Sequence, residues 1–131
     1  MDKKLDIKTR LSSLWIFVIF NIVFRDLHEM PTKDFLEEAL QGSVNGVQIT
    51  DDLMLFGGIL AEIMIIMPLV SLLAKYKINR LLNLIVGLII VAFLIFNGNT
   101  DIDDIFFMIV ELIALAYILL TAWKWKPVAN D

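Results

Sequence analysis

The chain has no cysteine and only one histidine, His28, among its 131 residues. The lack of cysteine excludes disulfides, thiolate metal sites and four-helix thiol oxidoreductases. A single histidine excludes a haem held by two histidines of the same chain. Charge is also scarce: in four long apolar stretches the only carboxylates are Glu62 and Glu111. These stretches cover roughly residues 11–24, 53–74, 81–96 and 105–123.

What the chain has in abundance is apolar residues. They make up 59% of it, against about 45–50% in soluble domains, and the mean hydropathy is +0.79. A bilayer core of about 30 Å is crossed by about 20 apolar residues in a helix. The sequence therefore predicts an all-α membrane protein, a single four-helix transmembrane domain over 1–131. The expected spans are about 9–28, 51–75, 78–97 and 104–124.

The connections between spans carry their own signals. Pro31 ends the helix of the first span. Residues 33–40 have apolar side chains on one side and acidic ones on the other, which predicts a short amphipathic helix on the outer membrane interface. Residues 42–46 are rich in turn formers and predict a loop, and Thr50 is suited to cap the second span. The second and third spans are separated by a very short turn, so they are expected to be antiparallel neighbours.

Basic residues are distributed unevenly between the two ends of the expected bundle. Nine of the eleven flank the inner ends of the spans, and only Arg25 and Lys33 lie at the other end. By the positive-inside rule, both termini of this multi-pass cell-membrane protein are expected in the cytoplasm. The outer face is acidic, which disfavours nucleic acid as a partner. The lipid bilayer is the expected environment, and a homo-oligomer is compatible with the sequence.

Polar residues of three spans fall on shared helical faces in the outer half of the bundle. An ionisable group at such depth is costly and marks a candidate functional site. Their spacings of three, four or seven residues place those of each span on one face. We therefore expect an outward-facing polar pocket whose ligand-binding residues are Asn21, Arg25, His28, Glu62, Asp104 and Glu111.

The charges of this pocket can be assigned provisionally from depth. Glu111 and Arg25 both lie near the outer rim, so they are expected to form an ion pair, with Glu62 left neutral as a proton carrier. In the alternative interpretation, Arg25 pairs with Asp26 or Glu29 at the interface and both glutamates only support helix packing.

Metal sites have little support in the sequence. The alternating oxygen side chains of residues 97–103 resemble the start of a calcium loop, but the sixth position is not glycine and the twelfth is not glutamate. The remaining metal candidates are His28, Asp101 and Asp103. We predict no metal and no cofactor.

Several stretches resemble a family of short prokaryotic four-helix membrane proteins known only as a domain of unknown function. They are residues 11–17, 24–29, 44–50, 60–62 and 97–107. The resemblance covers nearly the whole chain and implies a four-span membrane protein without an assigned activity. The bundle size is also similar to that of DoxX-like four-helix proteins. Small multidrug exporters match in size, but their essential glutamate lies in the first span, where this chain has none.

The function expected from these observations is binding. The chain would be a small membrane protein whose outward pocket takes a small ligand, a lipid headgroup or a cation. One alternative is a proton-coupled small-molecule transporter that uses Glu62 or Glu111; another is a membrane interaction subunit without a ligand. No catalytic residue is identified, and an enzyme is less expected than a binding protein.

Overall fold

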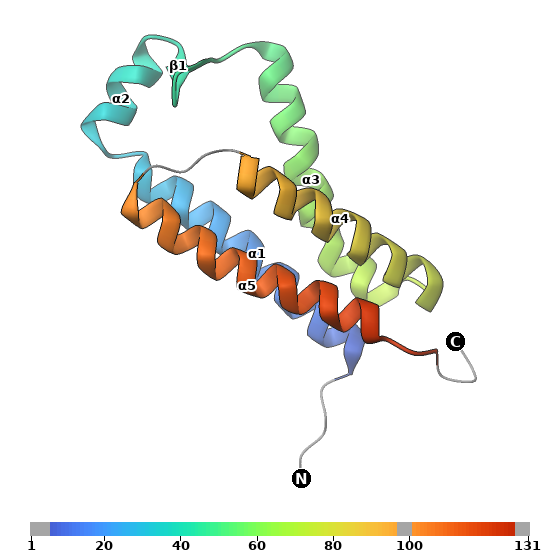
Figure 1. Cartoon of the computed structure of the whole chain (residues 1–131). Helices are drawn as coiled ribbons and strands as arrows, with labels where there is room; N and C mark the ends of the chain where they lie inside the picture. Colours follow the sequence, from blue (N-terminus) through green and yellow to red (C-terminus); the bar gives the residue numbers. More distant parts are fainter. Residues whose placement is uncertain (1–5, 97–100, 128–131) are drawn as a thin grey trace.

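Helices dominate the computed structural model, which describes residues 6–96 and 101–127. In chain order the elements are α1 (Ile7–Glu29), α2 (Lys33–Leu40), β1 (Ser43–Val44), β2 (Val47–Gln48), α3 (Asp51–Leu73), α4 (Tyr76–Phe96) and α5 (Ile102–Lys124) (Figure 1). Four of these helices are long and apolar enough to cross a membrane. The predicted all-α architecture with four spans and a short helix after the first is confirmed.

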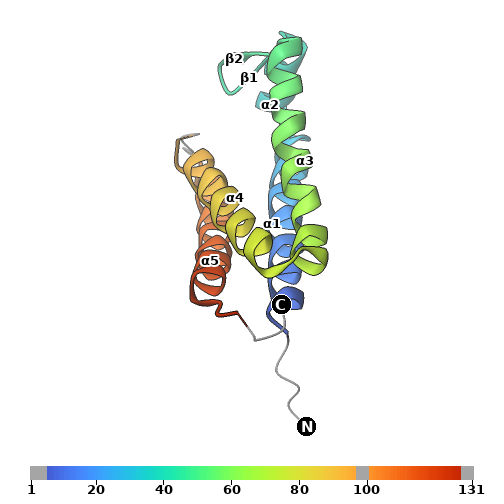
Figure 2. The ribbon, with the colours of Figure 1, turned by 90° about the vertical axis from the view of Figure 1, so that its right-hand side faces the viewer.

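The four long helices form an incompletely closed bundle. Helix α1 packs against α3 on one side and α5 on the other, and α4 packs against α5. Helices α3 and α4 touch much less, and from their short connection they diverge toward the end of the bundle that carries α2 (Figure 2). We call this end, with α2, β1 and β2, the outer end, and the opposite end, where α3 joins α4, the inner end.

The core is concentrated in the inner and middle parts of the bundle. Trp15 and Val18 of α1, Met67 of α3, and Leu115 and Ile118 of α5 are almost completely buried in one cluster. By contrast, residues 51–59 of α3 are all exposed. The large apolar side chains on the outside of the helices suit a lipid environment, because a bilayer offers no water for them to avoid.

The connection between α1 and α3 is more ordered than predicted. Residues 43–44 and 47–48 pair as an antiparallel hairpin, where we expected only a loop. Asn45 and Gly46 at its tip have φ of 52° and 74°. Left-handed backbone at both central residues is what a two-residue type I′ hairpin requires, and Asn-Gly is the preferred pair. The hairpin and α2 together lie over the outer end of α1 (Figure 1).

The residues that precede α3 and α5 occupy the capping positions of these helices. The backbone N–H of Leu53 donates to Thr50 Oγ at 3.2 Å, which confirms the predicted cap of α3. Helix α5 begins at Ile102 with Asp101 at the capping position, so Asp103 lies in the first turn. A negative charge there still suits the positive end of the helix.

Candidate functional site

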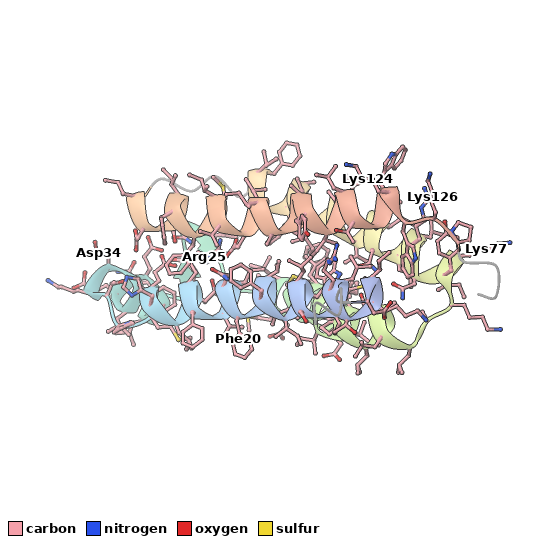
Figure 3. The ribbon with its side chains drawn as sticks, turned by 90° about the horizontal axis from the view of Figure 1, so that it is seen from below. Phe20, Arg25, Asp34, Lys77, Lys124 and Lys126 are labelled. Atoms are coloured by element: carbon pink, nitrogen blue, oxygen red, sulfur yellow. The ribbon has the colours of Figure 1, made fainter. Side chains whose placement is uncertain are left out.

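A buried ion pair joins α1 to α5 in the outer half of the bundle. Arg25 Nη1 donates to Glu111 Oε2 at 3.1 Å. The Glu111 side chain is 0% exposed and that of Arg25 is 14% exposed. Figure 3 shows Arg25 in the space between the two helices. The pairing expected from depth is therefore present, and it satisfies a charge that would otherwise be costly at this depth.

One oxygen of Glu111 is left over by this pair. Oε1 is buried and accepts no hydrogen bond from the described residues. A buried carboxylate oxygen without a donor is unfavourable by about 1–3 kcal/mol. Glu111 can therefore satisfy Oε1 by holding a proton there or by accepting a hydrogen bond from a donor that enters the site.

The surroundings of this pair are acidic. Arg25 Nε also lies 3.6 Å from Asp26 Oδ1, so the single arginine is shared between two carboxylates. Asp104 and Asp26 are close enough for their charges to act on Glu111. The outer half of the bundle thus carries more negative than positive charge, and Arg25 is not free to bind an anion.

A hollow of about 290 Å³ opens beside this acidic group. Asp26 and Glu29 line it from α1, Phe35 from α2 and Val44 from the hairpin, with Met30 between them. The walls combine two carboxylates with an apolar and aromatic surface. The sequence analysis missed this hollow because it needs the fold of the hairpin and α2 over α1, although the Asn-Gly turn was a signal for that fold.

Glu62 does not join the pair, so the expectation that it lies in one polar pocket with Arg25 and Glu111 is wrong. Its side chain is exposed and forms no ion pair or hydrogen bond with the described residues. The inward stripe of α3 contains Met64, Met67 and Ser71. At about 100° per residue, Glu62 lies nearly opposite this stripe. Gly58 and Glu62 are four residues apart and share a face of α3, but both are exposed, so that face points away from the bundle.

The other predicted site residues are arranged separately. Asn21 donates to the Phe17 carbonyl of its own helix at 3.0 Å instead of bridging to another span. His28 Nε2 lies 3.7 Å from Asp103 Oδ2, and both side chains are more than half exposed. Within 6–96 and 101–127, no three histidine or acidic residues gather closely enough to hold a metal ion. Residues 97–100 of the calcium-like stretch lie outside the described residues.

A family model matches residues 2–130 of the chain, that of a family of unknown function, DUF6326. This chain belongs to the DUF6326 family. No curated protein and no solved structure matches it. The resemblance to a four-helix family of unknown function is thereby confirmed, whereas the similarity in size to DoxX-like proteins is not supported.

In this DUF6326 member, a second polar cluster lies at the inner end and was not predicted. Trp15 Nε1 donates to Asn83 Oδ1 at 2.7 Å. The Asn83 amide donates to Asn79 Oδ1 at 2.8 Å and to Ser71 Oγ at 3.3 Å. All four side chains are buried. Two asparagines four residues apart in an apolar span were a usable signal, because such side chains hydrogen-bond across membrane helices.

An apolar layer separates the two polar clusters. By position along their helices, Val18, Met67, Ile90 and Leu115 lie between the Arg25–Glu111 pair and the inner cluster. Each is at most 1% exposed, and all four belong to one core. Within residues 6–96 and 101–127, no continuous line of polar side chains connects the two clusters.

Proposed function

We propose that this protein is a membrane protein that binds a small organic cation at its outer end. The observation that carries the proposal is the hollow that Asp26 and Glu29 line together with Phe35. Carboxylates attract a cationic group, and an aromatic face adds a cation–π contribution. The hollow, of about 290 Å³, is just below the usual size range of about 300–1,000 Å³ for small-molecule sites, which fits a ligand of few atoms.

The charges around the hollow support a cation over an anion. Arg25 is already engaged by Glu111 at 3.1 Å and Asp26 at 3.6 Å. A metal ion is a poorer fit, because the part of the chain that the structure describes brings no three suitable ligands together. An organic amine needs fewer direct ligands than a metal and also uses the apolar wall.

The experiment measures binding of 1,4-diaminobutane to the full-length protein in detergent by calorimetry, with 1,4-butanediol as the uncharged analogue. We expect binding of the diamine only, and at least tenfold weaker binding by Asp26→Asn/Glu29→Gln. The matched control is Asp34→Asn/Asp52→Asn, which removes two exposed outer carboxylates that do not line the hollow. Equal binding of amine and diol, or equal losses in the two double variants, would refute the proposal.

A second candidate function, as a self-associating interaction subunit, is favoured by the uncovered face of α3. A Cβ built on Gly57 or Gly58 meets nothing within 4 Å, and Glu62 is exposed one turn below. A carboxylate facing lipid is costly, and a second copy of the chain would cover it. Gly58→Cys should then form a disulfide between copies in membranes, whereas Leu88→Cys on α4 should not. No cross-link at position 58 would exclude a symmetric contact there.

A further inference from the structure

The inner end of the bundle holds a groove between α1 and α5 that neither candidate function uses. Its inner part is a hollow of about 260 Å³ lined by Arg10, Tyr117, Thr121 and Lys124, among others. Arg10 is partly buried and Lys124 is exposed. Neither side chain forms an ion pair within the described residues. Two cations and two hydroxyl groups therefore border one concave surface.

A second, wholly apolar hollow continues this surface toward the middle of the membrane. It measures about 360 Å³ and is lined by side chains such as Leu14, Phe17, Val110 and Ile113. Tyr117 lines both hollows, so the basic part and the apolar part meet at this residue. The result is one groove with a positively charged end at the membrane interface and an apolar part that extends toward the middle of the membrane.

The length of the combined groove corresponds to one leaflet. Val110 and Lys124 are about 21 Å apart along α5, at about 1.5 Å per residue. Half of a bilayer with its headgroups is about 20–22 Å thick. A phospholipid in that leaflet would place its phosphate beside the cations and its acyl chain over the apolar hollow. Basic pockets between transmembrane helices are known to take anionic headgroups in this way.

We propose that the α1–α5 groove is a binding site for an anionic glycerophospholipid of the leaflet on the basic side of the bundle. The α4–α5 side of the same end is a weaker candidate. There Arg80 already donates to the carbonyl oxygens of Ala122 and Trp123, at 3.1 and 3.3 Å. These hydrogen bonds satisfy carbonyl groups in the last turn of α5 that have no partner within the helix. Among the described residues, the α1–α5 groove has two cations without an ion pair or side-chain hydrogen bond, Arg10 and Lys124, whereas the α4–α5 side has one, Lys77.

The first test uses native mass spectrometry of the full-length protein with phosphatidylglycerol and phosphatidylcholine of matched chains. We expect retention of phosphatidylglycerol. Each basic group near a membrane surface contributes about a fivefold change in affinity, so Arg10→Gln/Lys124→Gln should bind it about thirtyfold more weakly. The matched control, Lys77→Gln/Lys126→Gln, removes two charges from the same end and should bind nearly as the unaltered protein does. Arg10→Lys/Lys124→Arg should also keep binding.

A second measurement on the unaltered protein remains decisive if the double variant does not fold. Phosphatidylglycerol with a photoreactive group in its acyl chain should cross-link to the segments around Leu14–Phe17 and Val110–Ile113. Cross-links spread evenly over the four helices, or centred on α3, would overturn the proposal. So would equal retention of phosphatidylcholine, or equal loss of binding in the control variant, because either would show only general attraction to lipid.

Discussion

Removing the charge of Glu111 should destabilise the protein far more than removing that of Glu62. Breaking a buried ion pair from one side costs about 3–5 kcal/mol, since it leaves the other charge without its partner. After Glu111→Gln, Arg25 keeps a weaker contact with Asp26 at 3.6 Å and has some exposure. We therefore expect a loss near the lower limit, about 3 kcal/mol.

The two comparison variants follow from the same geometry. Arg25→Gln leaves the Glu111 carboxylate, which is 0% exposed, without a donor to either oxygen among the described residues, so the loss should be near the upper limit, about 5 kcal/mol. Glu62→Gln changes an exposed side chain without a partner among the described residues. Its effect should stay within about 0.5 kcal/mol. The double variant Arg25→Gln/Glu111→Gln should lose less than the sum of its parts.

The assay is unfolding in mixed detergent micelles, followed by tryptophan fluorescence, with a double-mutant cycle for Arg25 and Glu111. The cycle should give a coupling of about 2 kcal/mol, because the two groups are in direct contact. Equal losses for the two glutamate variants, or a larger loss at Glu62, would refute the reasoning. Purely additive losses at Arg25 and Glu111 would also contradict it.

Three further predictions concern the rest of the bundle. Cysteines at Lys4 and Ser43 should label from opposite sides of the membrane in intact cells, and labelling of position 4 from outside would contradict cytoplasmic termini. Asn83→Ala should lower the free energy of unfolding by about 3 kcal/mol, because buried donors lose their acceptor; an unchanged denaturation midpoint would disagree. Tyr76→Phe removes the hydrogen bond to the Trp125 carbonyl at 3.0 Å and should cost about 1 kcal/mol in the same unfolding assay.

The spans and the main ion pair could be predicted because they depend on quantities that the sequence contains directly. Run length and apolarity define the four long helices, and the distance of Arg25 and Glu111 from the ends of their spans sets a shared depth. Both predictions needed only the rise per residue of a helix and the cost of charge in lipid.

The orientation of α3 could not be predicted for a physical reason. Helical spacing shows which residues share a face, but it does not show which face points inward when a helix is apolar on every side. Glu62 was therefore assigned to the interior, while the inward stripe is made by Met64, Met67 and Ser71. The Asn79–Asn83 pair, in contrast, was a recognisable signal, since two amides one turn apart in a span need partners.

The distance along the chain between Arg25 and Glu111 has a consequence for how the protein is made. The two residues are 86 positions apart, so α1 leaves the ribosome long before its counter-charge on α5 has been synthesised. Until then the long side chain of Arg25 can extend toward the headgroups, as arginines near helix ends do. The ion pair can form only when the last span is in place, so the packing of α1 against α5 is completed late during insertion.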